Sequence, residues 1–248
     1  MCIRDSPRTL VKLPAVGPHD LDCLDHALSQ DVDFVAVSYV RSAEDLIPAR
    51  ERIKAAGVHT WIVAKIEHPA ALEDLTAIVE SADIVMVARG DLGVEIPLEE
   101  VPAAQERIVS ACLERGTPVV VATQMLESMV NHARPTRAEV TDVATAIRQH
   151  VSAVMLSGET ASGQHPVKAV ETMARIAETV EQSTIGLPDP PALAAYVSTR
   201  VLAGSAINIA REINAKHLLV GTEYGNAARL MASHRPRIPI YAVTNQIR

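Results

Sequence analysis

A lysine and two carboxylates stand at the ends of neighbouring apolar runs. Lys65 and Glu67 close the run 61–66, and Asp91 follows the run 84–88. Carboxylate oxygens suit Mg²⁺, which takes few protein ligands and keeps its other positions for water and substrate oxygens. A lysine beside them can neutralise charge on a transferring phosphoryl group. The spacing therefore indicates a magnesium and phosphate site. Its alternative is a buried salt bridge, the more common reason for a Lys-x-Glu pattern.

Two glycines and a threonine lie where a substrate could be contacted. Gly90 and Gly93 bracket Asp91, so the backbone can turn sharply there and present an N–H group to an anion. Thr123 directly follows the apolar run 118–122, and its hydroxyl could orient a substrate or pass a proton through water. The alternatives are an ordinary strand-to-helix turn for the glycines and a helix N-cap for Thr123.

Five short apolar runs rich in β-branched residues predict buried strands, and segments with helical spacing separate them. The predicted strands are 33–37, 61–66, 84–88, 118–122 and 153–156. The predicted helices are 43–56, 70–80, 103–115, 138–149 and 167–181. Alternation of this kind favours right-handed crossovers in a parallel sheet, so the predicted fold class is α/β.

Polar residues after the strands help to decide between two parallel architectures. They are Ser38 and Arg41, Lys65 and Glu67, Arg89 and Asp91, Thr123 and Gln124, and Ser157 and Glu159. An open doubly wound sheet concentrates its ligands at one switch point, whereas a (β/α)8 barrel delivers them from every strand to one rim. Five units alone would favour the open sheet, but five consecutive polar strand ends favour the barrel.

A proline-rich stretch marks the end of this first domain. Residues 183–197 include Pro188, Pro190 and Pro191 and cannot continue a helix, so we expect a linker there. Beyond it the pattern predicts helices over 198–214 and 225–233 and strands over 217–221 and 238–243. Two strands are too little sheet for an independent core. We therefore expect a partial barrel over 7–182, the linker, and the start of a second α/β domain over 198–248, with residues 1–6 outside the fold.

Composition excludes several classes of protein. The 248 residues are 48% hydrophobic and 21% charged, which is typical of a globular protein. The net charge is −7, without runs of Lys or Arg, so we expect no nucleic acid partner. No apolar stretch approaches the ~18 residues of a membrane span and no signal peptide is recognisable, so we expect a cytoplasmic protein without a membrane partner. Three cysteines without metal-ligand spacing fit a reducing compartment.

Taken in order, the motifs resemble those of pyruvate kinase. The segments that carry the resemblance are 65–67 (KIE), 86–95 (MVARGDLGVE), 122–129 (ATQMLESM), 134–139 (RPTRAE), 155–161 (MLSGETA) and 222–226 (TEYGN). The resemblance covers nearly the whole chain. It implies a closed TIM (β/α)8 barrel, of which about five of eight strands are present here. It also implies phosphoryl transfer from phosphoenolpyruvate to ADP, giving pyruvate and ATP in glycolysis.

The same resemblance implies roles for individual residues. Glu67 and Asp91 would hold Mg²⁺, and Lys65 would stabilise the phosphoryl transition state. Gly90, Asp91 and Thr123 would contact the substrate, with Thr123 near the face where the enolate is protonated. Supporting roles would fall to Arg89, beside the metal loop, and to Ser157 and Glu159.

Further implications concern a complete protein of this family. The first barrel strands, an inserted lid domain and the end of the C-terminal domain have no counterpart in this sequence, so we expect the chain as given to be an inactive fragment. Potassium is a possible second cation, and its ligands would lie in those absent parts. The resemblance also implies that the parent protein is a homotetramer.

A possible effector loop lies in the second domain. Thr222, Gly225 and Asn226 connect the strand over 217–221 to the next helix. Backbone N–H groups at a helix N-terminus bind phosphate, and allosteric members of the family use this region for a phosphorylated sugar. Tyr224 stands where a small hydroxyl residue is usual, so a plain strand-to-helix turn is the alternative.

Two other functions compete with this interpretation. A Mg²⁺-dependent aldolase or lyase acting on pyruvate-like enolates would also use a Glu and an Asp on successive strands. The segments 65–67 and 123–126 argue against it. From a different class, the chain could be a noncatalytic remnant that survives as an interaction module.

Overall fold

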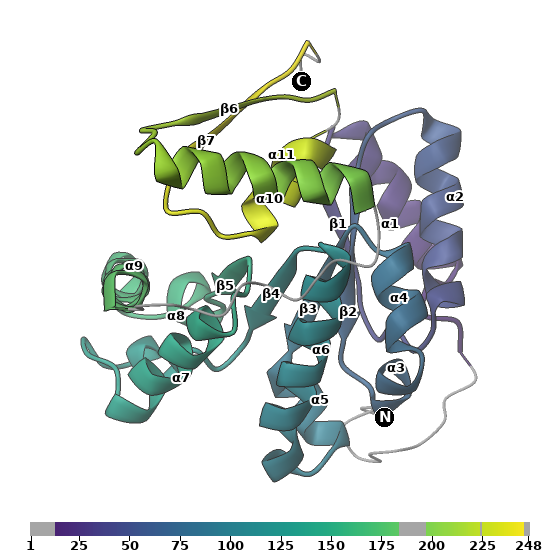
Figure 1. The fold of residues 1–248 in the computed structure, drawn as a ribbon. Helices are drawn as coiled ribbons and strands as arrows, with labels where there is room; N and C mark the ends of the chain where they lie inside the picture. The colour runs from purple at the N-terminus through teal and green to yellow at the C-terminus, as the bar shows by residue number, and fades with distance from the viewer. Residues whose placement is uncertain (1–12, 184–196, 224, 246–248) are drawn as a thin grey trace. The chain divides into compact units, whose positions relative to one another are not determined.

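The computed structural model describes residues 13–183, 197–223 and 225–245. The chain forms two compact units. One consists of Met1–Cys112 and Thr117–Gly186, and the other of Leu113–Gly116 and Leu187–Arg248. Each unit has its own parallel sheet (Figure 1).

The first unit is built on a five-stranded sheet. Its strands are β1 (Phe34–Val37), β2 (Trp61–Ile66), β3 (Ile84–Ala88), β4 (Val119–Ala122) and β5 (Ala153–Met155). They lie side by side in sequence order, and every neighbouring pair is parallel. A doubly wound sheet would reverse this order at a switch point, so the sequential order is that of consecutive units of a barrel. The α/β class and all five predicted strands are confirmed.

Helices precede, separate and follow these strands. They are α1 (Pro18–Ser29), η2 (Ala43–Leu46), α2 (Ile47–Ala56), α3 (Pro69–Glu73), α4 (Leu75–Ser81), α5 (Arg89–Glu95), η3 (Leu98–Glu100), α6 (Val101–Arg115), η4 (Glu127–Val130), α7 (Arg137–Arg148), α8 (Gly158–Ala161) and α9 (Pro166–Ser183). None of the described helices is both long enough and apolar enough to cross a membrane.

The helices differ from the sequence prediction in two respects. The sequence patterns do not indicate α1 or the short helices α5 and α8. The helix expected over 70–80 is divided at Asp74, whose backbone leaves the helical conformation between α3 and α4. The Asp74 carboxylate accepts a hydrogen bond of 2.9 Å from the backbone N–H of Ala43, so the division serves a contact with a distant segment.

The core of the first unit lies on the central strands. The fully buried residues of β2, β3 and β4 include Ile62, Ala64, Val85, Val87, Val119 and Val121. These residues alternate along each strand and therefore lie on one face of the sheet, while Met86 and Val120 of the other face are only partly buried. β1 and β5 at the edges are more exposed. The central strands therefore form a buried base for side chains placed at their ends.

The second unit contains α10 (Val197–Glu212), β6 (Leu218–Gly221), α11 (Asn226–Ser233) and β7 (Ile240–Val243). β6 and β7 pair in parallel, and the buried cluster between the elements consists of Ala203, Ile207, Val220 and Met231. All four predicted elements are confirmed to within a few residues. Most of the predicted linker over 183–197 lies outside the described residues, so the predicted domain boundaries stay a prediction.

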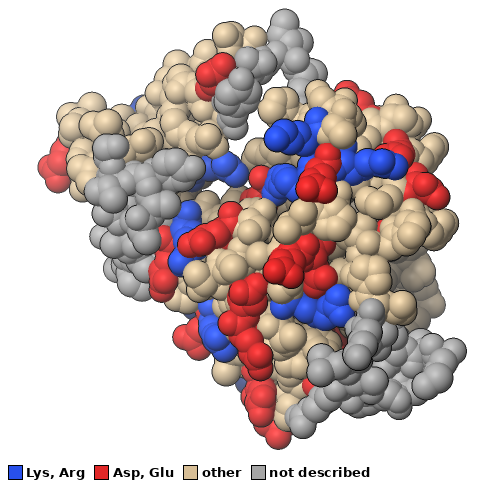
Figure 2. Space-filling model, turned by 90° about the vertical axis from the view of Figure 1, so that its right-hand side faces the viewer, with Lys and Arg blue, Asp and Glu red and all other residues tan. Residues whose placement is uncertain are grey.

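Charged side chains of both signs lie on the surface among uncharged residues (Figure 2). On the face shown in Figure 2, Lys and Arg lie among Asp and Glu. Of the two described cysteines, Cys23 is exposed and Cys112 is buried. Burial raises the pKa of the Cys112 thiol, so we expect this thiol to stay protonated and unreactive.

The burial pattern predicts that the same substitution at two leucines changes the free energy of unfolding by very different amounts. Leu46 is 2% exposed and Leu98 is 73% exposed. Leu46→Ala should lower the free energy of unfolding by about 2–5 kcal/mol, because it removes buried methyl groups and leaves a cavity. Leu98→Ala should change it by less than about 0.5 kcal/mol. Urea denaturation measures both values, and equal losses would contradict the described core.

Candidate active site

Glu67 and Asp91 lie at the same end of the sheet. β2 and β3 are parallel neighbours in which Ile66 is paired with Val87. Glu67 therefore follows β2 beside the end of β3, and Asp91 lies in the first turn of α5, which begins directly after β3. The register brings the two predicted metal ligands to one rim.

Glu67 is buried, and both of its carboxylate oxygens have partners. Its side chain is 1% exposed, and Oε1 lies 2.6 Å from Nζ of Lys65. Oε2 accepts a hydrogen bond of 2.6 Å from the backbone N–H of Tyr39. Lys65 also donates to Oγ of Ser38 at 3.0 Å, and its side chain is 24% exposed. The salt bridge considered as the alternative is therefore present, and it pairs a buried carboxylate with a lysine whose side chain is partly exposed.

Tyr39 is a site residue that the sequence motifs did not single out. Its φ of +53° lies in the left-handed region, which is unusual for a bulky residue. The hydrogen bond from its N–H to Glu67 joins residues 28 positions apart in the chain. Local sequence carries no signal for such a conformation, because its stabilising partner follows the next strand, β2.

The donor set at this rim fits Mg²⁺. Within the described ranges, no group of three or more His, Cys, Asp or Glu side chains could hold a metal ion alone. Magnesium usually takes only one or two protein carboxylates and completes its shell with water and substrate oxygens. Glu67 and the half-buried Asp91 supply that number of hard oxygen donors.

Thr123 and Gln124 form a turn in which both residues are left-handed, with φ of +70° and +54°. Oγ1 of Thr123 accepts a hydrogen bond of 2.7 Å from the Gly90 N–H and donates one of 2.6 Å to the Ala122 carbonyl. Thr123 is thus not a helix N-cap, and the Gly90 N–H is donated to Thr123 rather than left for an anion. A Cβ at Gly90 would lie 3.2 Å from Thr123 Oγ1, so a larger residue there would crowd the threonine.

Arg89 supports this turn from α5. Its buried guanidinium donates through Nη2 to the carbonyls of Thr123 and Gln124, at 2.9 and 3.0 Å. Its Nη1 lies 2.7 Å from the carboxylate of Asp142 on α7. Arg89 therefore connects the ends of β3 and β4. The sequence suggests only a general supporting role, whereas the structure shows that Arg89 holds the turn at Thr123 and Gln124.

Ser157 and Glu159 follow β5 and belong to the same region. The Glu159 carboxylate is fully buried; it accepts hydrogen bonds from the backbone N–H groups of Leu126, at 2.9 Å, and Ser157, at 2.8 Å. Oγ of Ser157 is also buried, and it has no hydrogen-bond partner among the described residues. The structure therefore connects the loops after β4 and β5 through one carboxylate.

Glu139 in the first turn of α7 caps its own helix and also binds η4, farther along the loop after β4. Its carboxylate accepts hydrogen bonds from the N–H and Oγ of Ser128, at 2.7 and 2.6 Å, and from the N–H of Thr136, at 2.6 Å. Burial acts to raise the pKa of Glu139, but hydrogen bonds from Ser128 and Thr136 outweigh it and hold the pKa below its ordinary value.

The predicted effector loop lies in the second unit. Thr222 follows β6 and donates its N–H to the Val243 carbonyl at 2.9 Å. Gly225 has φ of +82° and precedes α11, whose first residue, Asn226, accepts a hydrogen bond from Arg229. Tyr224 lies outside the described residues, so an effector role for this loop stays a prediction.

Comparison with known proteins adds family models, relatives and a solved structure. Two family models match: "Pyruvate kinase, barrel domain" over residues 4–170 and "Pyruvate kinase, alpha/beta domain" over residues 200–248. "Pyruvate kinase 2" of Synechocystis is 43% identical over 241 residues, which are 97% of this chain and 41% of that protein. A Mycobacterium tuberculosis protein named pyruvate kinase is 42% identical over 238 residues, covering 96% of this chain and 50% of the relative.

The crystal structure of a pyruvate kinase from Cryptosporidium parvum superimposes with a TM-score of 0.89 at 39% identity. The match covers 97% of this chain and 52% of that one. The chain thus spans about half the length of the relatives that it matches.

The lowered pKa of Glu139 predicts a pH-dependent contribution to stability. A carboxyl group whose pKa is lowered by folding stabilises the fold in full above its ordinary value of 4.5, and this contribution is lost as the pH falls through the lowered pKa. The difference in free energy of unfolding between the wild type and Glu139→Gln should therefore shrink on acidification below that value. Urea denaturation at a series of pH values measures it.

The control for this experiment is Glu106→Gln, because Glu106 is exposed on α6. The free energy of unfolding of Glu106→Gln should change with pH in the same way as that of the wild type. A wild-type advantage over Glu139→Gln that grows on acidification would contradict the assignment.

Proposed function

This chain belongs to the pyruvate kinase family, and on that basis we propose that its rim residues take part in phosphoryl transfer from phosphoenolpyruvate to ADP. The observation that carries the proposal is the Lys65–Glu67 pair at the end of β2, with Asp91 at the end of the neighbouring β3. A lysine ammonium group beside two carboxylates that can hold a metal ion would supply the positive charge that transfer of a negatively charged phosphoryl group requires.

The proposed reaction has two chemical parts. The bond between phosphorus and the enol oxygen of phosphoenolpyruvate breaks, and a bond forms between phosphorus and an oxygen of the ADP β-phosphate, which gives ATP and the enolate of pyruvate. The methylene carbon of the enolate then takes a proton and becomes the methyl group of pyruvate. The site must therefore stabilise moving negative charge and also deliver a proton.

We assign the first task to Lys65. Its ammonium group is held by Glu67 and Ser38 and is partly exposed, so an anion can approach it while its position stays fixed. A fixed positive charge accelerates the reaction most where negative charge develops in the transition state.

The residues that would hold Mg²⁺ are Glu67 and Asp91. When bound, the ion supplies positive charge that draws phosphate and carboxylate oxygens of the substrates together. The chain's own contribution is to present both carboxylates from strand ends whose register is fixed by the sheet. A potassium requirement of the whole protein stays a prediction.

The second task, proton delivery, we assign to the Thr123 hydroxyl acting through water. In the structure this hydroxyl donates its hydrogen to the Ala122 carbonyl and accepts from the Gly90 N–H. Its hydrogen must therefore turn away from Ala122 to serve a substrate. The Gly90 N–H would continue to donate to the hydroxyl oxygen while its hydrogen turns.

Several properties of the whole protein stay predictions. These are the homotetramer, the sugar phosphate effector at Thr222, Gly225 and Asn226, and the cytoplasmic location. Because the chain spans about half the length of its relatives, turnover is best assayed in the longest natural protein that contains it. The 248-residue chain alone is a second sample, which we expect to be inactive.

Replacing the lysine should affect turnover more than binding. We expect Lys65→Met to lower kcat by about 100- to 1000-fold with a much smaller change in KM for phosphoenolpyruvate, because its charge acts mainly in the transition state. Steady-state kinetics coupled to pyruvate formation measures both. The control is Lys54→Met, at an exposed position near the end of α2. Preserved kcat with a raised KM would make Lys65 a binding residue instead.

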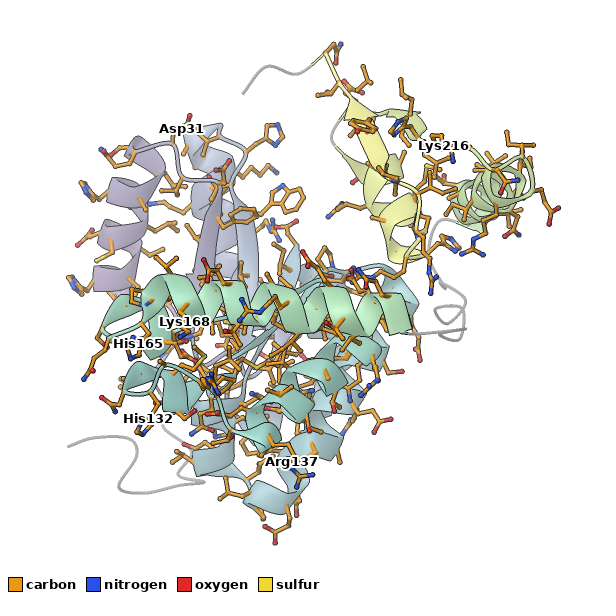
Figure 3. The ribbon with its side chains drawn as sticks, turned by 90° about the vertical axis from the view of Figure 1, so that its left-hand side faces the viewer. Asp31, His132, Arg137, His165, Lys168 and Lys216 are labelled. Carbon is orange, nitrogen blue, oxygen red and sulfur yellow. The ribbon has the colours of Figure 1, made fainter. Side chains whose placement is uncertain are left out.

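Replacing one carboxylate should weaken metal binding directly. Asp91→Asn should reduce the affinity for Mn²⁺, used as a magnetic probe in place of Mg²⁺, by at least about tenfold while the fold is retained. Electron paramagnetic resonance titration measures this without turnover. The control is Asp31→Asn, because Asp31 precedes β1 at the opposite ends of the strands (Figure 3). Equal affinities in wild type and Asp91→Asn would remove Asp91 from the metal site.

A further inference from the structure

Glu159 is a buried carboxylate with an unusual environment. Its side chain is fully buried, and its carboxylate accepts hydrogen bonds from the backbone N–H groups of Leu126 and Ser157. No Lys, Arg or His side chain of the described residues forms an ion pair with it. A buried charge without a paired cation is costly unless hydrogen bonds compensate it, so such a residue is rarely explained by packing alone.

The two N–H groups come from loops that follow different strands. Leu126 belongs to the loop after β4, and Ser157 follows β5 directly, while Glu159 itself lies on the short helix α8. One carboxylate thus fixes the distance between the ends of two neighbouring strands. Its loss would leave buried N–H groups without acceptors.

The loop held in this way begins with the strained turn. Thr123 is β-branched and has φ of +70°, a conformation that such residues adopt only when their surroundings impose it. Arg89 holds the carbonyl groups of Thr123 and Gln124, and Glu159 holds the N–H of Leu126 two residues later. Arg89 therefore holds the turn through its carbonyl groups, and Glu159 holds the loop just after the turn through a backbone N–H.

We propose that Glu159 is a positioning residue that sets the place of the Thr123 hydroxyl for the proton step. This proposal rests on the proposed function, in which Thr123 delivers the proton to the enolate. Glu159 does not touch the substrate; it acts through the backbone of the loop after β4. The same carboxylate holds the N–H of Ser157, whose buried Oγ has no partner among the described residues, so it also fixes a second hydroxyl near the strand ends.

The test compares two glutamates that both accept backbone N–H groups. Glu159→Gln keeps the side-chain shape but puts an amide NH₂ where an acceptor is needed, so one of its two contacts is lost. Glu139→Gln makes the matching change at a carboxylate bound to Ser128 and Thr136, beyond the turn. Both variants are made in the longest natural protein that contains this chain. Thermal unfolding gives the stability of each.

Two kinetic readouts separate positioning from stability. We expect Glu159→Gln to lower kcat by up to about 100-fold, because a small displacement of a reacting group has effects of that size, with little change in KM for phosphoenolpyruvate. Incorporation of deuterium from D₂O into the methyl group of pyruvate should slow at least as much. Glu139→Gln should leave both rates near those of the wild type. Glu159→Asp keeps the carboxylate on a shorter side chain, and its rates should lie between those of the wild type and Glu159→Gln.

A wild-type kcat in Glu159→Gln would overturn the proposal. It would also be overturned if kcat fell in both Glu159→Gln and Glu139→Gln in proportion to their loss of stability. Unfolding of both Glu159 variants at the assay temperature would also overturn it, because the carboxylate would then serve the fold as a whole. The methyl resonance of Thr123 in NMR spectra gives a readout that does not depend on turnover. It should move in Glu159→Gln and not in Glu139→Gln. A wild-type protein without turnover would refute the proposed function, while this resonance would still report on the turn.

Discussion

The buried guanidinium of Arg89 joins the parts of the site that different strands supply. It binds the carbonyl groups of Thr123 and Gln124 after β4 and the carboxylate of Asp142 on α7. A guanidinium suits this position because it is planar, always charged and has several donors that can serve separate acceptors at once. Asp91 lies two residues after Arg89 on α5, so the side chain that fixes the turn also fixes the segment carrying this carboxylate.

Two carboxylates at the rim show different ways of keeping charge inside a protein. Glu67 is balanced by the ammonium group of Lys65 and by one backbone N–H, whereas Glu159 depends on backbone N–H groups alone. The first arrangement leaves a cation near solvent, where a charged ligand can meet it. The second ties loops together without any movable partner. In the proposed reaction these would be a charge-handling role and a geometric role, and the fixed dipoles around both would need no rearrangement.

The sequence predicts those features that depend on short-range pattern. Strands such as 84–88 are runs of apolar, mostly β-branched residues, and Asp91 could be placed at the rim because it follows such a run. The left-handed conformations of Tyr39 and Thr123 and the break at Asp74 could not be predicted. Each is accompanied by a hydrogen bond to a partner 28 to 34 residues away. Recognition of the motifs finds the residues of the site, but not the contacts that orient them.

The sequential order of the sheet also has a consequence for synthesis on the ribosome. Each of β2, β3, β4 and β5 pairs with the strand before it, so each βα segment that emerges can add to a surface already formed. None of these four strands has to wait for a partner encoded later, and the loops to be closed between them are crossovers of one βα unit each. Vectorial growth of this kind leaves only β1 and the newest strand as edges of the growing sheet, which limits the sites at which nascent chains can associate with one another.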